Sequence, residues 1–197
     1  MRKIFLFVAI CLASIGGLYA QSHTSLTYSI GFPTGDLGDF ISQPSFRGIT
    51  LDYHKLIQPN IGVGFSVGWN VFYEDLANDT YTIDNVSLNG KQYRYMNYWP
   101  MLAKGAYYLS PGEAINPFVG LGVGTIYSLR NTDMNLYTVE VDAWNFALQP
   151  EVGVLFNVDP SVAVTLVAKY YNGFAASGDL DTAQSYFTLN LGFTFIK

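Results

Sequence analysis

The chain has 197 residues, enough for one domain, and its formal net charge is −5. Aromatic residues make up 16% of it and charged residues only 13%, about half the charged share of a typical globular protein. The acidic balance excludes binding to nucleic acid or to an anionic membrane through a basic patch.

The first twenty residues form a predicted processing segment. Arg2 and Lys3 give it a basic start, residues 4–13 form an apolar run, and Ala20 offers a small residue before the cleavage point. The run is too short to cross a bilayer as a helix, which takes roughly 20 residues. We therefore predict a cleaved signal peptide over residues 1–20.

The remaining chain, residues 21–197, is predicted to be a single domain. The only cysteine, Cys11, lies in the signal segment, so the domain enters an oxidising compartment without disulfides. Its 8 basic residues (the chain's 10 less Arg2 and Lys3) face 15 acidic ones, a net charge of −7. No apolar run in the domain is long enough for a transmembrane helix. Any membrane role must therefore use strands.

Eight segments of the domain alternate between large apolar residues and small or polar ones with a period of two, as β-strands do. In chain order they cover residues 25–32, 47–56, 61–73, 93–109, 117–128, 145–157, 162–172 and 185–197. The third segment is the most regular, and its large face carries Ile61, Val63, Phe65, Val67, Trp69, Val71 and Tyr73. Segments of about ten residues match the span of a tilted transmembrane strand.

The connections between these segments alternate strictly between short and long. Tight turns rich in Pro, Asn, Asp and Gly are predicted at residues 58–60, 110–113 and 159–161. The other four connections are expected to be long polar loops, at residues 33–45, 74–92, 131–144 and 175–184. Antiparallel neighbours would then have every short turn at one end and every long loop at the other.

The sizes of the two strand faces indicate which one points inward. An eight-stranded barrel has an interior only just wide enough for side chains, so glycines and short polar groups fit there better than bulky apolar ones. Glycine along a water-facing strand would weaken the strand and pack against nothing. Closure also satisfies every backbone polar group within hydrocarbon. We therefore predict an all-β fold, a closed antiparallel up-and-down transmembrane β-barrel of eight strands.

The ordered set of eight segments resembles the small outer-membrane β-barrel proteins of Gram-negative bacteria. The likeness is carried by the signal segment and by residues 101–108, 117–124 and 189–195. It implies short periplasmic turns, longer external loops and a location in the cell outer membrane. In this family the assembly machinery reads a final strand with a terminal aromatic residue, whereas here Phe195 is followed by Ile196 and Lys197.

The partners that we expect follow from this resemblance and from the charge. They are outer-membrane lipid, lipopolysaccharide and the outer-membrane assembly machinery. Nucleic acid is not expected as a partner, and the protein is expected to be a monomer.

Four charged residues on the polar faces form the candidate site, because they would share the lumen: Asp52, Lys104, Glu151 and Lys169. Glu151 and Lys169 lie nine residues on either side of Pro160, so a symmetric hairpin would set them opposite each other. An unpaired charge in so confined an interior is costly, so we expect pairing. We interpret the four as a structural charge network, with a gated ion path and acid–base chemistry as the alternatives.

The sequence does not indicate an enzyme. Enzymes with this fold, such as lipid A deacylases, need a His near a Ser and a carboxylate at the outer rim. The two histidines are expected elsewhere, His23 in the leader of the first strand and His54 close to the periplasmic end. No Cys or His cluster predicts a metal site, and no phosphate-binding glycine loop precedes a helix. We therefore predict no catalytic residue, metal or cofactor.

The aromatic and the acidic residues also have predicted positions relative to the membrane. Aromatic residues near strand ends are expected to form girdles at the membrane interfaces, with ordinary strand propensity as the alternative; they are Tyr28, Trp69, Tyr73, Tyr93, Tyr95, Trp99, Tyr107 and Tyr170. Most acidic residues fall in the long loops and are interpreted as a solvated surface: Asp36, Asp39, Glu74, Asp75, Asp79, Asp84, Asp133, Glu140, Asp142, Asp179 and Asp181.

Together these observations predict a structural or surface-interaction role through the external loops. Two alternatives stay open. The first is a narrow channel for small or hydrophobic solutes. The second is a secreted lipocalin-like binding barrel, in which the apolar faces would turn inward.

Overall fold

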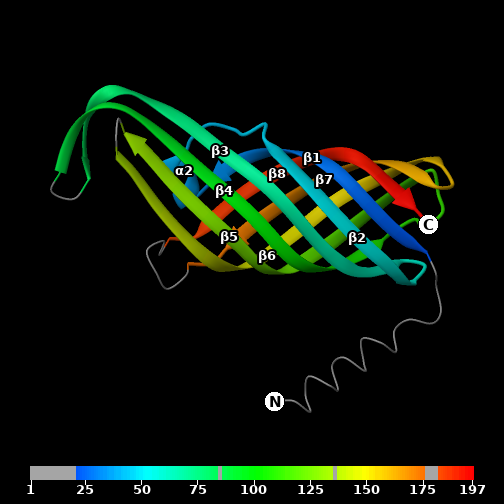
Figure 1. Cartoon of the computed structure of the whole chain (residues 1–197). Helices are drawn as coiled ribbons and strands as arrows, with labels where there is room; N and C mark the ends of the chain where they lie inside the picture. The colour runs from blue at the N-terminus through cyan, green and yellow to red at the C-terminus, as the bar shows by residue number, and fades with distance from the viewer. Residues whose placement is uncertain (1–20, 84–85, 135–136, 176–181) are drawn as a thin grey trace, which may run out of the picture.

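The computed structural model describes residues 21–83, 86–134, 137–175 and 182–197, and within them the chain forms a closed barrel of eight antiparallel strands (Figure 1). The strands are β1 (Ser22–Thr34), β2 (Gly48–Gln58), β3 (Ile61–Ile83), β4 (Val86–Tyr108), β5 (Ile115–Met134), β6 (Tyr137–Asp159), β7 (Val162–Gly173) and β8 (Gln184–Ile196). The ring closes where β1 pairs with β8, with Thr24 opposite Phe195. The predicted fold class is confirmed. The predicted signal peptide lies outside the described residues.

The large apolar faces point away from the barrel axis. Phe65, Val123 and Leu191, each from a different strand, are 48%, 39% and 57% exposed. Their neighbours of opposite parity, such as Ser66 and Asn190, are fully buried. The lipocalin-like alternative is therefore excluded, because it requires the bulky groups to fill the lumen.

The lumen itself is less polar than the alternation pattern predicts. Large apolar and aromatic side chains are fully buried inside the barrel, among them Phe72, Tyr98, Ile126, Tyr171 and Tyr186. Phe72 stands in a run of three apolar residues, so hydrophobicity alone cannot assign it to a face. The interior therefore has an apolar cluster in addition to its charged residues.

The two ends of the barrel differ as predicted. The short turns lie at the same end as the C-terminus, which we call the short-turn end (Figure 1). The long connections lie at the opposite, hairpin end. Of the predicted long loops, residues 74–92 and 131–144 are mostly strand, so that part of the prediction is wrong. These segments carry polar residues on both faces, so they show no alternation of apolar and polar residues. Their residue types do favour strands, as in the run Thr80-Tyr81-Thr82-Ile83.

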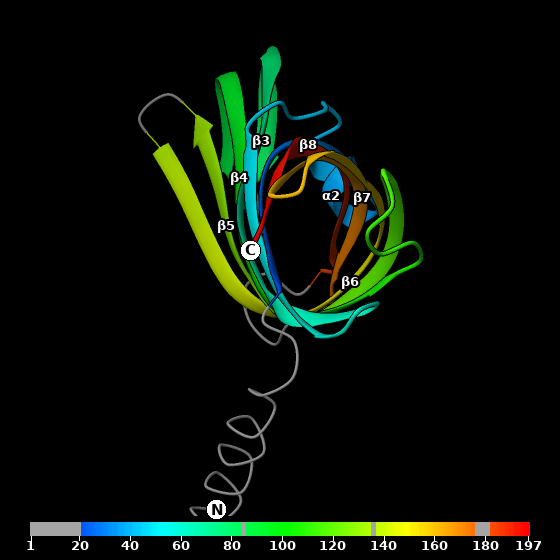
Figure 2. The same ribbon diagram turned by 90° about the vertical axis from the view of Figure 1, so that its right-hand side faces the viewer.

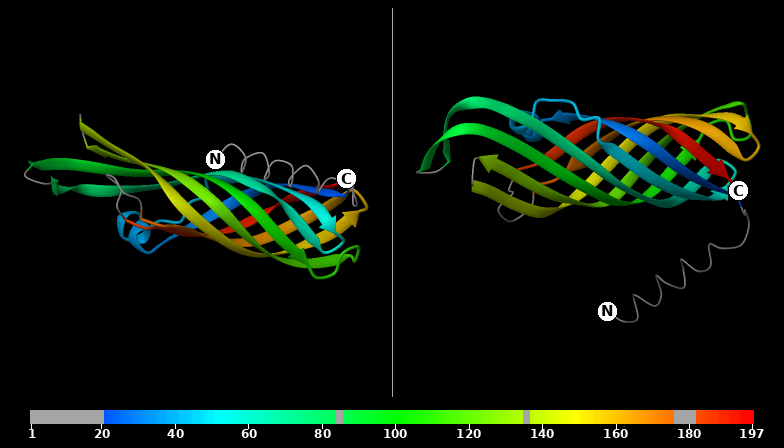
Figure 3. Two further views of the ribbon diagram at one scale, coloured as in Figure 1. Left: turned by 90° about the horizontal axis from the view of Figure 1, so that it is seen from below. Right: turned by 45° about the horizontal axis from the view of Figure 1, so that its top comes forward.

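These strand extensions form a protruding sheet, made of residues 74–83, 86–94, 132–134 and 137–145 of β3 to β6 (Figures 1 and 3). On one side β2 stops at Gly48, opposite Asn70 of β3. On the other side the last pair of β6 with β7 is Ala147 with Gly173. One further backbone hydrogen bond follows on each side, from Val71 N–H to the Arg47 carbonyl and from Phe174 N–H to the Phe146 carbonyl, and the four strands then continue without β2 and β7.

The connection from β1 to β2 contains a short helix, α2 (Asp36–Phe40), that the sequence pattern does not predict. Gly35 turns the chain into it with a φ of 56°. Leu37 and Ile41 are fully buried against the apolar cluster of the lumen. Figure 2, viewed along the barrel, shows α2 inside the outline of the ring. The helix therefore closes the hairpin end of the lumen.

In the described part of the chain, no helix has the length and apolar character needed to span a membrane.

Some of the aromatic residues expected in the interfacial girdles lie on the outer surface of the barrel. Trp69, Tyr107 and Tyr170 are exposed on the outer surface of the barrel. On β4, β5 and β6, Trp99, Tyr127 and Trp144 form one cross-strand row, with ring centroids 5.5 and 5.0 Å apart. Their depth in a bilayer stays a prediction. Among the acidic residues expected in loops, Asp84, Asp179 and Asp181 lie outside the described residues.

An arginine on the outward face tests this orientation. We expect Val123→Arg to lower the free energy of unfolding from lipid vesicles by about 2–4 kcal/mol, because the charge would enter hydrocarbon. Val158→Arg, beside a short turn, is the matched control and should change it by about 0–1 kcal/mol. Urea titration followed by tryptophan fluorescence measures both. Equal effects of the two variants would contradict the outward orientation of Val123.

Candidate functional site

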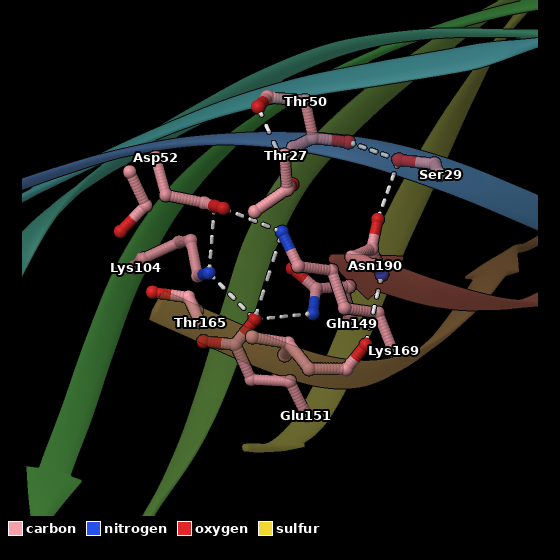
Figure 4. A network of polar contacts seen from close by, with 12 residues as sticks. Thr27, Ser29, Thr50, Asp52, Lys104, Gln149, Glu151, Thr165, Lys169 and Asn190 are labelled. Atoms are coloured by element: carbon pink, nitrogen blue, oxygen red, sulfur yellow. Dashed lines mark hydrogen bonds and ion pairs between the residues drawn. The ribbon is translucent and has the colours of Figure 1, made fainter. Parts of the chain in front are cut away.

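The four predicted charged residues meet in the middle of the lumen (Figure 4). Lys104 Nζ lies 2.8 Å from Asp52 Oδ1 and 2.6 Å from Glu151 Oε2. Lys169 Nζ lies 2.6 Å from Asp52 Oδ2 and 3.9 Å from Glu151 Oε2. Each carboxylate therefore faces both ammonium groups, and the four formal charges sum to zero. We call these four residues the charge network.

The strand register explains why these residues meet. Glu151 on β6 is directly opposite Lys169 on β7, as the hairpin around Pro160 sets them. Asp52 comes from β2 and Lys104 from β4, so the network joins strands from across the ring. All four residues are buried. Burying a charge is costly unless it is paired. Here each buried carboxylate is paired with ammonium groups, which offsets that cost.

Glycines on β5 make room for the network. Gly120 stands opposite Glu151, and a Cβ atom at Gly120 would lie 2.6 Å from Glu151 Oε1. Gly122 stands opposite Gln149, and a Cβ there would lie 3.0 Å from Gln149 Oε1. Gln149 in turn donates a hydrogen bond from Nε2 to Glu151 Oε2 at 3.0 Å. Gly120 and Gly122 thus leave space for the side chains of Glu151 and Gln149.

A belt of hydroxyl and amide groups continues from the network toward the hairpin end (Figure 4). Ser29 Oγ lies 3.0 Å from Thr50 Oγ1 and also donates to Asn190 Oδ1. The Asn190 amide donates to Thr188 Oγ1 at 2.8 Å. These contacts link β1, β2 and β8, the strands at which the ring closes.

Beyond this belt the lumen is filled by aromatic rings. Tyr186 stacks on Tyr171 and Tyr98, with ring centroids 4.6 and 4.9 Å apart. Phe72 meets Tyr186 edge-on at 5.4 Å. The Tyr98 hydroxyl donates to Gln184 Oε1 at 2.6 Å. With α2 above it, this cluster fills the lumen at the hairpin end.

The two histidines lie on the short-turn side of the charge network. His23 is opposite His54 in the β1–β2 register. His23 contacts the Tyr108 ring edge-on at 5.0 Å, and His54 Nδ1 lies 3.4 Å from the Tyr108 hydroxyl. Ser25 on β1 is hydrogen-bonded to Thr194. The geometry provides no hydrogen-bonded Ser–His pair here, and within the described residues no cluster of His, Cys, Asp or Glu could hold a metal ion.

Free space in the lumen is unevenly distributed. At the short-turn end a cavity of about 460 Å³ opens beside His23, Asn116 and Asn157. Next to the charge network the free volume falls to about 10 Å³. That is close to the roughly 10–15 Å³ needed by a single water molecule. The cavity beside the charge network therefore has room for about one water molecule.

A closed ring with an apolar outer surface and a charged, filled lumen is the architecture of a transmembrane β-barrel. The chain matches the family model of the outer membrane protein beta-barrel domain over residues 5–195, and it belongs to this family. It is therefore a protein of the outer membrane of Gram-negative bacteria. No curated protein matches the chain at a significant level.

Solved structures share the fold at low sequence identity. Ail, the attachment invasion locus protein of Yersinia pestis, is 13% identical with a TM-score of 0.57, over 91% of this chain and 100% of that one. OprG from Pseudomonas aeruginosa is 12% identical with a TM-score of 0.55, over 93% and 98% of the two chains. The outer membrane protease OmpT from Escherichia coli is 9% identical with a TM-score of 0.52, over 93% and 100%. Identities this low show a common fold only.

Breaking the network should destabilise the barrel. Lys169→Met leaves the Asp52 carboxylate without its 2.6 Å partner, and removing one member of a buried pair costs about 3–5 kcal/mol. Adding Asp52→Asn should recover most of the loss, because Lys104 and Glu151 then remain as a neutral pair. Urea unfolding in detergent micelles measures both variants.

The control is the exposed pair Lys91–Asp75, whose charged atoms are 3.1 Å apart. The hydrogen bond from Lys91 to Asp75 raises the pKa of Lys91, but both groups are in water. Lys91→Met should therefore leave the unfolding midpoint unchanged. A midpoint for Lys169→Met equal to that of Lys91→Met would refute pairing of Lys169 in the lumen.

Proposed function

We propose that the protein is a non-conducting, non-catalytic outer-membrane barrel that presents its protruding sheet to a partner protein at the cell surface. The observation that carries the proposal is the unpaired edge of β6, residues 137–145. In the part of the chain that the structure describes, this edge pairs with β5 alone. Unpaired backbone N–H and C=O groups on a strand edge are a template for another strand.

The composition of the β6 edge suits strand addition. Its pairing with β5 is regular up to Tyr137, and it contains the β-favouring residues Tyr137, Val139 and Val141. Tyr137 and Val139 are 64% and 45% exposed. An incoming strand would therefore find both backbone partners and apolar side-chain surface.

The other edge of the protruding sheet is less suitable. On β3 the register with β4 shifts between Leu76 and Asp79, an irregularity of the kind that protects strand edges. Asp75 and Asp79 add charge along it. We therefore assign the interaction to the β6 edge rather than the β3 edge.

The charge of the β6 edge selects the kind of partner. Glu140 and Asp142 are exposed on its outer face, and Asp133 lies beside them on β5. A second copy of this chain would bring the same negative charges and be repelled. The fitting partner is an extended segment with basic side chains, which electrostatic attraction would steer to this edge.

The filled lumen supports a role outside the barrel rather than through it. The aromatic cluster and α2 occupy the hairpin end, and the charge network narrows the centre. The channel alternative would need these side chains to move together. We also propose that the outer apolar surface contacts lipid and lipopolysaccharide, that the outer-membrane assembly machinery inserts the barrel, and that it is a monomer.

A peptide selection tests the β6 edge. The protein, embedded in phosphatidylcholine nanodiscs, is used to select from a displayed library of random peptides. We expect enrichment of β-forming peptides with basic residues. Replacing residues 131–140 with Asn-Gly, which joins the opposed pair Arg130 and Val141, should abolish the enrichment.

Two variants control this selection. Replacing residues 77–91 with Asn-Gly, which joins the opposed pair Leu76 and Gln92, shortens the other hairpin and should leave enrichment intact. The charge reversal E140K/D142K should weaken binding of the selected basic peptides. Retained binding to the variant shortened at residues 131–140 would overturn the proposal, provided that its band still shifts on boiling as a folded barrel's does.

Conductance measurements test the closed lumen. In planar bilayers the wild-type protein should show no steady single-channel conductance, because the cavity beside the network has room for about one water molecule. A steady conductance that is lost on substituting Lys104 or Glu151 would instead establish a channel through the network.

A further inference from the structure

We propose that the hairpin-end mouth of the barrel binds a sugar that carries an oxyanion group, held between Arg94 and Arg130. A cavity of about 370 Å³ lies at this mouth and is lined by Asp36, Asp39, Phe40, Arg94, Arg130 and Thr182. Its volume lies within the range of small-molecule sites, roughly 300–1,000 Å³. The site is distinct from the β6 edge and from the charge network.

The strands and α2 together position the two arginines. Arg94 on β4 and Arg130 on β5 lie on the inward faces of neighbouring strands, since Arg130 stands opposite Met96 and Arg94 opposite Thr132. Both guanidinium groups stack on the ring of Phe40 from α2, with Cζ 4.8 and 3.6 Å from its centroid. One aromatic ring therefore holds two positive charges at the same cavity.

Among the described residues, neither arginine forms an ion pair with a carboxylate. Arg94 donates to Gln92 Oε1 at 3.2 Å and to the Phe40 carbonyl at 2.8 Å, both neutral acceptors. The Arg130 guanidinium stacks on Phe40, and among the described residues no carboxylate forms an ion pair with it. Among these residues no ion pair within 4.0 Å includes either side chain.

The absence of an ion pair is notable because carboxylates stand close by. Glu74 is directly opposite Arg94 in the β3–β4 register, yet its two oxygens accept hydrogen bonds from the Ser42 backbone N–H (2.9 Å) and hydroxyl (2.6 Å). Asp36 accepts from the backbone N–H of Ala183 at 3.2 Å. The geometry thus directs these two carboxylates to other donors and leaves guanidinium N–H groups free for an external oxyanion.

The residues that line the cavity define the ligand chemistry. Guanidinium groups bind phosphate, sulfate and carboxylate groups through paired hydrogen bonds. Asp39 and the Thr182 hydroxyl line the same cavity and can accept hydrogen bonds from sugar hydroxyls. A sugar with one oxyanion group could bind the two arginines through that group and Asp39 and Thr182 through its hydroxyls. Such a group can come from a soluble sugar or from the headgroup of lipopolysaccharide.

Calorimetric titration with glucose 6-phosphate, on the full-length mature protein in phosphatidylcholine nanodiscs, tests the site. We expect binding that weakens with added salt, with glucose itself not binding. Arg94→Gln and Arg130→Gln should each lower the affinity about tenfold or more, because each removes a charge-assisted hydrogen-bond donor. Asp39→Asn should weaken binding of glucose 6-phosphate but not of inorganic phosphate.

Arg47→Gln is the matched control. Arg47 also stacks on an aromatic ring, with Cζ 5.7 Å from the centroid of Tyr73, but it does not line the cavity. This variant should bind as the wild type does. Heat-modifiability on gels confirms that each variant is folded.

Nanodiscs that contain lipopolysaccharide separate the two sources of ligand. Loss of glucose 6-phosphate binding in these discs would assign the site to the lipopolysaccharide headgroup, and retained binding would assign it to soluble sugars. The proposal is overturned if the wild type binds neither glucose 6-phosphate nor inorganic phosphate at millimolar concentration. It is equally overturned if folded R94Q/R130Q binds them as tightly as the wild type.

Discussion

The need to satisfy every backbone N–H and C=O group within hydrocarbon governs this structure. A sheet meets that need only by closing on itself, and closure with eight strands leaves an interior barely wider than the side chains that fill it. The lumen therefore behaves as a packed core of limited volume. Glycines on β5 give space to Gln149 and Glu151, the four charges of the network sum to zero, and tyrosine rings stack farther toward the hairpin end.

The barrel could be predicted from the sequence because lipid imposes a simple rule on half of the residues. Outward positions must be apolar, so a period of two appears in every spanning segment, and Phe65, Val123 and Leu191 follow it. The rule does not apply above the membrane. Strands β3 and β6 continue there with polar residues on both faces, so residues 74–83 and 137–144 look like loops to a hydrophobicity pattern although they form sheet.

The inner residues were harder to predict, because their roles depend on neighbours from distant strands. The pairing of Glu151 with Lys169 follows from local hairpin symmetry around Pro160, and the sequence was sufficient to predict it. The contacts of Lys104 with both carboxylates depend on closure of the whole ring. Arg130 was missed entirely, because its partner Phe40 comes from a helix of five residues that no pattern marks.

The protruding sheet determines the direction in which a bound strand would lie relative to the membrane. About nine residues of β6 stand beyond its last pair with β7, and at roughly 3.3 Å per residue they extend some 30 Å along the strand. A segment docked on that flank would run outward from the bilayer instead of lying flat on it. Binding would then take place at a distance from the lipid phosphates, where a large partner protein can approach without entering the carbohydrate layer of the cell surface.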